Sequence, residues 1–331
     1  MNAPPPVDFR SFGDFGSLRP PLILLVGPTA VGKTEIAIQL AERLNGEIVS
    51  ADSRLFYRGM DIGTAKPTPA ERARVPHHLI DVANPDETWS LAMFQQAARE
   101  AIANIHARGK NPFLVGGAGQ YVRAVTEGWS PPEVKANSKM RDEIGKLVLS
   151  KVEGMNEERG KEWLYEKLKT LDPEAAEKMD LRNVRRTIRA LEVILTTGRK
   201  FSEQRGQVDS PYRLATIGLT RPRAELYARV DARIESMFAA GLVEEVRGLL
   251  AKGYSPELPS MSGIGYRECV GVVNGQVTAD QAKVQMRHDT RVFVRRQANW
   301  FKEGDPSIRW FVVQKNTARE ILNFIQKQID F

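Results

Sequence analysis

Cysteine and histidine are scarce in this sequence. Cys269 is the only cysteine among 331 residues, which excludes a disulfide within the chain. There are four histidines, two of them adjacent, and this supply does not favour a structural zinc site. Such a composition is typical of the reducing cytoplasm, and we expect the protein to be cytoplasmic.

Long apolar runs are also lacking. The apolar segment 22–26 is short and is followed by turn residues, whereas a membrane-spanning helix needs roughly 20 apolar residues. We therefore expect no membrane association. Residues 1–20 are rich in Pro, Gly and Phe and contain no apolar run with a basic flank, a pattern that predicts a flexible N-terminal tail rather than a secretion signal.

The charge balance is modestly basic. The sequence has 48 Lys and Arg against 41 Asp and Glu, a formal net charge of +7. This excess suits a polyanionic partner, but it is also common among ordinary soluble proteins. With 42% apolar residues, the chain is long enough for one large core or two smaller ones, so one domain and two domains are both open at this point.

Short apolar segments alternate with helical periodicity along much of the chain. The strand-like segments are residues 22–26, 47–50, 79–82, 113–115, 214–219 and 309–313, and helical patterns cover residues 33–44 and 91–107. Wholly apolar strands are typical of a parallel sheet that is covered on both faces. The alternation therefore predicts an α/β sheet whose strands are joined by right-handed crossovers.

A glycine-rich loop follows the first of these strands. It consists of Gly27, Pro28, Thr29, Ala30, Val31, Gly32, Lys33 and Thr34, which match the phosphate-loop pattern between a strand and a helix. Backbone N–H groups and the helix dipole would face an anion, Lys33 would add a charge, and the Thr34 hydroxyl would bind Mg²⁺. A chance glycine turn is the alternative. The pattern predicts a ligand with at least two linked phosphates.

The strand ends around this loop carry only one acid. The strand 113–115 ends in Gly116-Gly117, although nucleotide hydrolases of this class hold magnesium with an Asp at such a place. Asp52 instead follows the strand 47–50, and the carboxyl ends of parallel strands converge on the ligand crevice. We interpret Asp52 as a group that handles a proton or a metal, with a helix-cap or turn Asp as the alternative.

The strand signal vanishes in the middle of the chain, where charged, helix-periodic sequence replaces it. Long helical patterns return at residues 223–252, broken near Gly241, and at residues 278–301. The predicted fold class is α/β, a P-loop NTPase-like parallel sheet core with an inserted all-helical subdomain. Its predicted parts are a tail (1–20), a core with C-terminal helices (21–130 and 206–331) and a helical insertion (131–205).

Arginines recur at helical spacing in two places. Arg182, Arg185, Arg186 and Arg189 fall at i, i+3, i+4 and i+7, which predicts one helical stripe of like charges. A nucleic acid backbone would neutralise such a stripe, and a solvated face is the alternative. A second stripe consists of Arg287, Arg291 and Arg295, near Phe293, Trp300 and Phe301. We expect these aromatic residues to belong to the core rather than to stack on bases.

Several segments, in the same order, resemble the bacterial tRNA dimethylallyltransferases, and the likeness spans most of the chain. They are the glycine loop, Asp52-Ser53 through Tyr57, and residues 59–67 (Gly-Met-Asp-Ile-Gly-Thr-Ala-Lys-Pro), 76–81 (Pro-His-His-Leu-Ile-Asp), 114–117 (Leu-Val-Gly-Gly), 189–193 (Arg-Ala-Leu-Glu-Val), 265–267 (Gly-Tyr-Arg) and 295–297 (Arg-Arg-Gln). The run at 59–67 is especially distinctive.

This resemblance implies a prenyl donor, dimethylallyl pyrophosphate, whose pyrophosphate occupies the glycine loop together with Mg²⁺. The acceptor would be the N6 amine of adenosine 37 in tRNA, beside the anticodon, and pyrophosphate would be released. Asp52 would be the general base, while Lys33, Thr34 with magnesium, and Arg233 would stabilise the leaving group. Arg229 would either help at the pyrophosphate or pair with an acid. We expect the protein to act as a monomer.

The resemblance also implies a set of contacts to the anticodon stem-loop. The expected tRNA-binding residues are Asp52, Ser53, Arg54, Leu55, Ala118, Arg182, Asn183, Arg186, Ser262, Gly263, Ile264, Gly265, Tyr266 and Arg267. Three of these places depart from the family's pattern. Ala118 stands where Thr is common, Leu55 where Gln is frequent, and Ser262-Gly263 where an Arg-Cys pair is usual.

Two other functions fit a phosphate loop without this resemblance. A small-molecule kinase would consume ATP at the loop, and an RNA-binding switch would bind nucleotide and RNA without altering the RNA. Prenyl transfer differs from both in what it demands. An allylic carbon ionises readily once charge on the departing oxygen is neutralised, so the site needs cations above all, together with a mild base.

Overall fold

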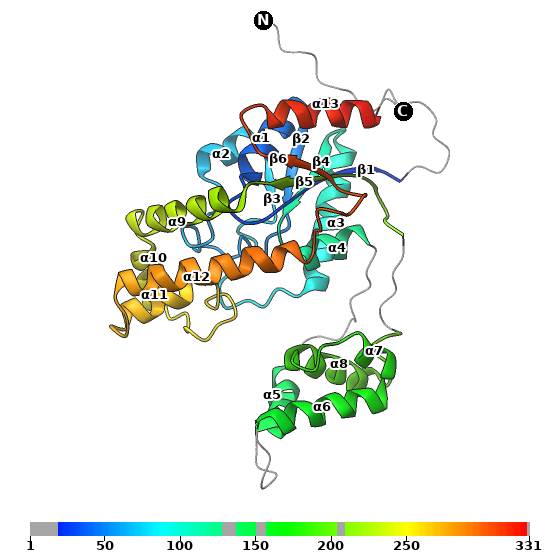
Figure 1. Ribbon diagram of the computed structural model, residues 1–331, viewed down its shortest axis with the longest axis vertical. Helices are drawn as coiled ribbons and strands as arrows, with labels where there is room; N and C mark the ends of the chain where they lie inside the picture. The colour runs from blue at the N-terminus through cyan, green and yellow to red at the C-terminus, as the bar shows by residue number, and fades with distance from the viewer. Residues whose placement is uncertain (1–18, 128–136, 150–156, 204–208, 330–331) are drawn as a thin grey trace, which may run out of the picture. The chain divides into compact units, whose positions relative to one another are not determined.

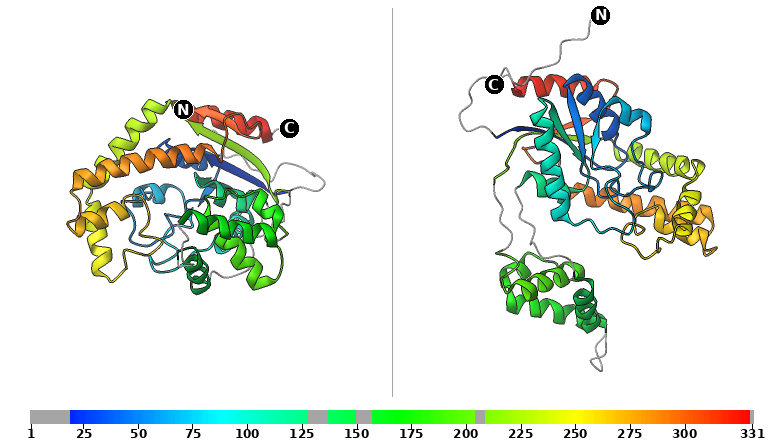
Figure 2. Two further views of the ribbon diagram at one scale, coloured as in Figure 1. Left: turned by 60° about the horizontal axis from the view of Figure 1, so that its bottom comes forward. Right: turned by 180° about the vertical axis from the view of Figure 1, so that it is seen from behind.

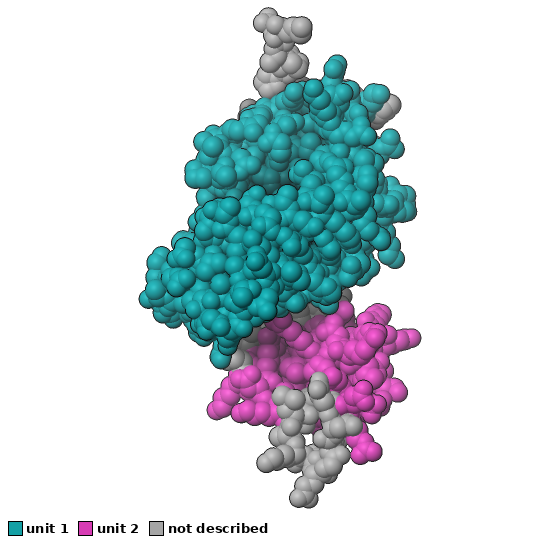
Figure 3. Space-filling model, turned by 60° about the vertical axis from the view of Figure 1, so that its left-hand side comes forward, with its two compact units in different colours: residues 1–126, 210–331 teal, residues 127–209 magenta. Residues whose placement is uncertain are grey.

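The structure is a computed structural model that describes residues 19–127, 137–149, 157–203 and 209–329. The predicted tail, residues 1–20, therefore lies almost wholly outside the described residues. The chain forms two compact units, one of Met1–Thr126 with Ser210–Phe331 and the other of Glu127–Asp209, and Figure 3 colours them separately. The predicted insertion, 131–205, falls inside the second unit. No described helix is long and apolar enough to cross a membrane.

The first unit contains a sheet of six strands (Figure 1). The strands are β1 (Pro21–Val26), β2 (Gly46–Ser50), β3 (His77–His78), β4 (Asn111–Gly116), β5 (Arg213–Thr220) and β6 (Arg309–Val312). Their order is β3-β2-β4-β1-β5-β6, and every neighbouring pair is parallel. The apolar strand β1 lies at the centre of this sheet, between β4 and β5. The predicted α/β parallel sheet is confirmed.

Helices cover both faces of the sheet. Helix α1 (Lys33–Arg43) joins β1 to β2, whereas α3 (Leu91–Ala107) leads from β3 back to β4. These two connections run in opposite directions across the sheet, so right-handed crossovers place their helices on opposite faces. Helix α13 (Thr317–Ile329) packs beside α1, and α4 (Gly119–Thr126) packs beside α3 (Figure 1). A short helix, α2 (Pro69–Arg74), begins at a capping box made by Thr68 and Glu71.

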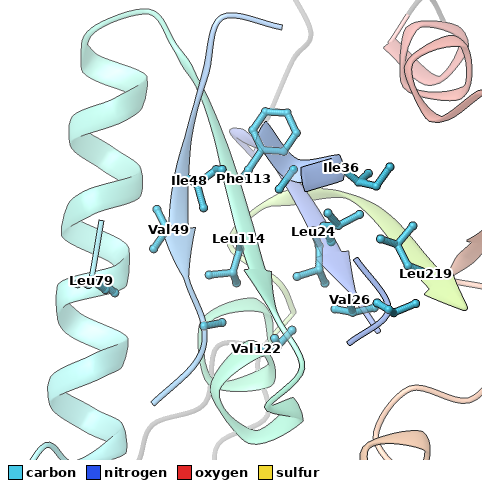
Figure 4. Packing of buried hydrophobic residues seen from close by; sticks show 14 of the residues in the cluster. Leu24, Val26, Ile36, Ile48, Val49, Leu79, Phe113, Leu114, Val122 and Leu219 are labelled. Carbon is cyan, nitrogen blue, oxygen red and sulfur yellow. The ribbon is translucent and has the colours of Figure 1, made fainter. Parts of the chain in front are cut away.

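The core lies between the sheet and these helices (Figure 4). Leu24, Val49 and Leu114 come from adjacent strands, while Ile36 reaches the sheet from α1 and Val122 from α4; all five are buried. Burying such apolar surface contributes about 25 cal/mol per Å² to folding. The core therefore fixes the strand ends that carry the glycine loop.

Four further helices follow β5 and return to β6. They are α9 (Arg223–Ala239), α10 (Leu242–Ala251), α11 (Tyr266–Val273) and α12 (Ala279–Ala298). The predicted break near Gly241 is confirmed, because Gly241 adopts a φ of 95°, a left-handed conformation that suits glycine. Figures 1 and 2 show α12 running beside α9, in agreement with their contacts. This pair leads from the far end of the unit to the edge of the sheet.

The second unit is helical throughout its described residues. It contains α5 (Ser138–Leu149), α6 (Glu157–Leu171), α7 (Pro173–Glu177) and α8 (Val184–Thr197). These helices have their own apolar core, which includes Leu164, Leu168 and Phe201. A fully buried carboxylate, Glu192, accepts hydrogen bonds from Arg141 and Arg189 in this unit.

One predicted strand is in the wrong place. The expected strand 79–82 is not formed; β3 comprises only His77–His78, immediately before it. Leu79 and Asp81 have positive φ values of 62° and 57°, which no β-strand accommodates. The turn brings the Asp81 carboxylate to Lys66 at 2.6 Å and to Arg72 at 2.7 Å. Leu79 and Ile80 are thus buried as part of a turn, not of a strand, and the ion pairs of Asp81 stabilise this turn.

Two leucines on α6 test whether the helical unit depends on its own core. Leu168 is 0% exposed and Leu171 is 42% exposed. We predict that Leu168→Ala destabilises the unit by roughly 2–5 kcal/mol, since it leaves a cavity, whereas Leu171→Ala costs less than about 0.5 kcal/mol. Hydrogen exchange measured peptide by peptide should show lost protection in α5–α8 of the Leu168 variant and unchanged protection in the sheet. Equal loss in both units would contradict separate cores.

Candidate active site

The carboxyl ends of β1, β2 and β4 meet at one edge of the sheet. The Ala51 N–H donates a hydrogen bond to the Val115 carbonyl at 2.8 Å. A Cβ on Gly116 would lie 2.5 Å from the Ala51 carbonyl oxygen, and one on Gly117 would lie 2.9 Å from that of Gly27. Glycine is therefore required at both positions for the three strand ends to approach this closely.

The glycine loop begins where β1 ends. Gly27 has a φ of 149°, and a Cβ there would lie 2.5 Å from the Leu219 carbonyl oxygen of β5. Gly32, with a φ of 107°, caps the N-terminus of α1. The first N–H groups of an α-helix have no partner within the helix, so the amides of Lys33 and Thr34 are available to an anion in the loop.

Lys33 links the loop to the charged groups around it. Its Nζ donates hydrogen bonds to the carbonyls of Gly27 at 3.0 Å and Pro28 at 2.8 Å, which leaves the third N–H of the ammonium for a ligand. Burial lowers the pKa of Lys33 to about 8; the Asp52 carboxylate opposes this change and Arg233 adds to it. The predicted catalytic groups Lys33, Asp52 and Arg233 thus share one electrostatic environment.

Arginines from α9 and from the end of β5 surround the loop. Arg229 donates from Nε to the Ala30 carbonyl at 2.8 Å, so it holds the loop rather than pairing with an acid. Arg233 lies deeper, where burial and the nearby Arg229 lower its pKa. Arg221, which we did not predict, donates from Nε to the Val31 carbonyl at 2.8 Å. The guanidinium groups of Arg221 and Arg229 also lie close to Gly32, since a Cβ added there would be 3.8 Å from the first and 3.9 Å from the second.

Asp52 lies at the end of β2, beside this group of cations. One carboxylate oxygen accepts the Arg54 N–H at 3.0 Å, and the Asp52 carbonyl accepts the Leu55 N–H at 3.1 Å. One oxygen therefore stabilises a turn, as the alternative interpretation proposed. The second oxygen is left for a substrate, so the turn and a chemical role are compatible.

The residues after Asp52 connect two segments of the predicted tRNA site. The Arg54 guanidinium donates to the carbonyls of Pro259 at 3.1 Å and Ser260 at 3.3 Å. The Ser53 side chain hydrogen-bonds to Tyr121, a residue we did not predict, whose pKa burial raises. Arg54 therefore holds the loop that follows Asp52 against the loop that precedes α11.

The predicted tRNA-binding residues 262–267 differ in how open they are. A Cβ on Gly263 would lie 3.6 Å from the Arg54 guanidinium, and the Ser262 hydroxyl donates to the Pro259 carbonyl at 2.6 Å. Tyr266, in contrast, is 1% exposed. Ile264 is half-buried, Gly265 has a φ of 101°, and Arg267 pairs with Glu268 and Asp289. The structure thus brings the first part of this segment to Arg54 and holds the rest by contacts within the protein.

Glu245 explains why Tyr266 is buried. Its carboxylate accepts the Tyr266 hydroxyl at 2.6 Å and the N–H groups of Asp61 at 2.9 Å and Ile62 at 2.8 Å. The distinctive run at 59–67 therefore wraps around one carboxylate from α10. Sequence reasoning missed Glu245 because no motif marks it.

The predicted stripe of arginines in the helical unit is wrong at its first member. Asn183 caps α8 and its side chain accepts the Arg186 N–H, so the helix begins at Val184 and Arg182 precedes it. Arg182 is instead bound to Asp180 through two hydrogen bonds, of 3.0 and 2.8 Å, although its side chain stays 88% exposed. Arg189 faces the buried Glu192. Only Arg185 and Arg186 remain as helical cations without an acidic partner among the described residues.

The second stripe lies against α9. Arg287 pairs with Glu235, and Arg291 pairs with Asp231 at 2.7 Å while its guanidinium lies 5.2 Å from the ring centre of Tyr227. The aromatic prediction holds for Phe301 only, because Phe293 and Trp300 are exposed. Trp300 instead packs under the Arg123 guanidinium.

The loop fits a magnesium ion that is bound together with phosphates. Among the described residues, no group of three His, Cys, Asp or Glu side chains is arranged to hold a metal. Mg²⁺ commonly takes one or two protein oxygens and fills its remaining positions with phosphates and water. Thr34, at the start of α1, has a hydroxyl oxygen that could hold such an ion. These features define a class of α/β proteins that hold linked phosphates at a glycine loop.

Comparison with known sequences narrows this class. A family model described as IPP transferase matches residues 55–304, and one described as isopentenyl transferase matches residues 20–82. A tRNA dimethylallyltransferase of Roseiflexus sp. (strain RS-1) is 54% identical over 85% of this chain and 90% of its own length. That of Chloroflexus aurantiacus is 51% identical over 91% of this chain and 98% of its own. The chain belongs to the IPP transferase family.

Solved structures agree with this assignment. The tRNA isopentenylpyrophosphate transferase of Bacillus halodurans is 40% identical, with a TM-score of 0.68, and the match covers 94% of this chain and 97% of that one. A eukaryotic dimethylallyltransferase acting on tRNA shares the fold, with a TM-score of 0.73 at 24% identity.

The buried lysine predicts a pH dependence of donor binding. A diphosphate would bind best while Lys33 is protonated, so above about pH 8 the affinity for inorganic pyrophosphate should fall about tenfold per pH unit. Because Asp52 supports the charged form, Asp52→Asn should move this fall to lower pH. Calorimetric titration without tRNA, at a series of pH values, measures both effects. In the control, Lys33→Arg, the fall should vanish; an unchanged fall would assign it to another group.

Proposed function

We propose that this protein transfers a dimethylallyl group from dimethylallyl pyrophosphate to the N6 amine of adenosine 37 in tRNA, next to the anticodon, and releases pyrophosphate. Family membership supports the reaction class, and relatives are named tRNA dimethylallyltransferases. The observation that carries the proposal is the shared environment of Lys33, Arg233 and Asp52 at the mouth of the glycine loop. It combines cations for a leaving diphosphate with a single carboxylate for a proton.

The donor half of the reaction depends on these cations. The bond between the allylic carbon and the bridging oxygen breaks, and the oxygen keeps the electron pair. Lys33, Arg229, Arg233 and the amides at the start of α1 would neutralise the charge that develops on the diphosphate. Because these groups are already fixed by the loop carbonyls and by burial, little reorganisation accompanies the reaction.

We also propose Mg²⁺ as a cofactor for cleavage of the donor. The Thr34 hydroxyl would hold the ion, and the donor phosphates and water would complete its coordination. When bound, the ion would add positive charge at the departing oxygens. Lys33 would keep its own hydrogen bonds to the loop in that state, since these use only two of the three N–H groups of the ammonium.

The acceptor half depends on Asp52. As the adenine amine forms its bond to the allylic carbon, it must lose a proton, and the free oxygen of the Asp52 carboxylate would accept it. A stacked adenine cannot reach a buried carbon, so the base must leave the anticodon loop and enter the pocket. Ser53 and Arg54 follow Asp52 in the loop after β2, and Ala118 follows the end of the neighbouring strand β4. We propose that these three residues contact the extruded nucleotide.

The partner and setting follow from this chemistry. We propose that the anticodon stem-loop of tRNA is bound by the site and by the helical unit, and that the enzyme works as a monomer in the cytoplasm. In the helical unit, Arg186 and the exposed Arg182 are the proposed contacts, with Asn183 fixing the start of α8 between them.

Mass analysis of tRNA tests the proposal directly. After incubation with dimethylallyl pyrophosphate and magnesium, one adenosine should gain the mass of one isoprenoid. Asp52→Ala should bind tRNA normally but lose at least ~10²-fold in rate, as expected for removal of a general base. Asp86→Ala, which removes an exposed carboxylate from a nearby loop, is the control and should keep its rate. Unmodified tRNA together with ATP consumption would favour the kinase, and full activity of Asp52→Ala would exclude Asp52 as the base.

Salt dependence tests the arginines of the helical unit. Replacing Arg182 and Arg186 by Gln should weaken tRNA binding and reduce the slope of log affinity against log salt by about 2, since two phosphate contacts are lost. Donor binding should not change. Replacing Arg319 and Lys327 of α13 removes the same charge from the other unit and should leave the slope almost unchanged. If both double variants showed equal slopes, Arg182 and Arg186 would be solvent-exposed charges that do not contact the RNA.

A further inference from the structure

Gln297, in the last turn of α12, spans two loops of the site. Its Oε1 accepts the Thr29 N–H of the glycine loop at 2.8 Å, and its Nε2 donates to the Gly117 carbonyl at 3.2 Å. We infer that Gln297 is a positioning residue that sets the separation between the diphosphate and the acceptor base. This inference rests on the proposed function, which it extends to a residue of α12 whose side-chain contacts are to the two loops.

The two loops are shaped to receive this amide. Gln297 is 6% exposed, and a Cβ on Gly117 would collide with its Nε2. Two residues later, a Cβ on Gly119 would collide with the Trp300 side chain. Glycine at both positions therefore lets the end of α12 press against the turn that follows β4. The fit places the buried amide between the loops that follow β1 and β4.

A primary amide is the one side chain of this length that accepts on one side and donates on the other. Removing it would leave the half-buried Thr29 N–H and the buried Gly117 carbonyl without this partner, which is costly chiefly at the buried carbonyl. The amide also fixes the Thr29 backbone before any ligand arrives. The loop that receives the diphosphate is thereby pre-organised from a residue 268 positions away in the sequence.

The hydrogen bond from Gln297 to Gly117 bears on the reaction because of where Gly117 lies. Gly117 precedes Ala118, the proposed contact of the adenine, and Thr29 belongs to the loop that holds the donor. The Gln297 side chain therefore connects the loop proposed to bind the donor with the turn proposed to contact the acceptor base. Because bond formation needs the reacting atoms within about 3–3.5 Å, a small change in this separation should lower kcat more than it weakens binding of either substrate.

Gln297→Leu and Gln297→Glu separate the two hydrogen bonds. Leu removes both hydrogen bonds. Glu keeps an oxygen that accepts the Thr29 N–H, but it puts a carboxylate oxygen, which cannot donate, against the Gly117 carbonyl. Hydrogen exchange should show lost protection in peptides covering residues 27–34 and 116–120 for Leu, but only in 116–120 for Glu. Unchanged protection in both peptides of the Leu variant would overturn the inference. This arm needs no turnover, so it remains decisive even if tRNA proves not to be the acceptor.

Kinetics supply the second arm. Gln297→Leu should lose about 10- to 100-fold in kcat, while the Kd for inorganic pyrophosphate and the KM for tRNA change less than about threefold. Asn299→Leu, at an exposed amide in the same helix end, is the matched control and should keep its kcat. Parallel losses of kcat, pyrophosphate affinity and thermal stability would show a merely structural residue and refute the positioning role. A wild-type enzyme that leaves tRNA unmodified would refute the proposed function instead.

Discussion

Repulsion between cations that gather at one loop is the constraint on which the site depends. Lys33, Arg229 and Arg233 gather at the glycine loop, and burial together with mutual repulsion lowers the pKa of Lys33 and of Arg233. Asp52 offsets only part of this charge. An anion in the loop would offset the remaining positive charge, so the repulsion between these cations would favour the binding of a diphosphate. In the proposed reaction, the same charges would also stabilise the diphosphate as it departs.

This arrangement requires rigid support, because cations that repel one another would otherwise separate. The support comes from backbone carbonyls: Lys33 binds those of Gly27 and Pro28, Arg229 binds that of Ala30, and Arg221 binds that of Val31. Each cation thus holds the loop that it charges. On the other side of the site, Arg54 and Glu245 perform the equivalent task for the segments expected to meet the RNA.

Local patterns predicted much of the fold and the donor half of the site. The glycine loop was predictable because strand, loop and helix are consecutive in sequence, and Asp52 was predictable because parallel strands end at one edge. The position of β3 was not, since the apolar residues after it turn at Leu79 and Asp81 instead of extending. Likewise, helical spacing placed Arg182 on α8, whereas Asn183 caps this helix, which begins only at Val184.

Residues that act across the fold left no local signal. Gln297 was visible only as part of a family segment, with no role attached, since its partner Thr29 lies at the other end of the chain. Glu245 and Arg221 belong to ordinary helical and turn sequence, and only the folded chain brings them to the loops that they hold. These long-range contacts connect the loops that make up the site, and the spacing of residues in the sequence does not predict them.

The identity of the anion in the loop is the central claim, and the phosphorus product of turnover measures it most directly. With prenyl donor and tRNA present, the account predicts one pyrophosphate released for each adenine modified, and no phosphate released from ATP when RNA is absent. Steady release of phosphate from ATP without RNA, with no pyrophosphate from the prenyl donor in its presence, would contradict it.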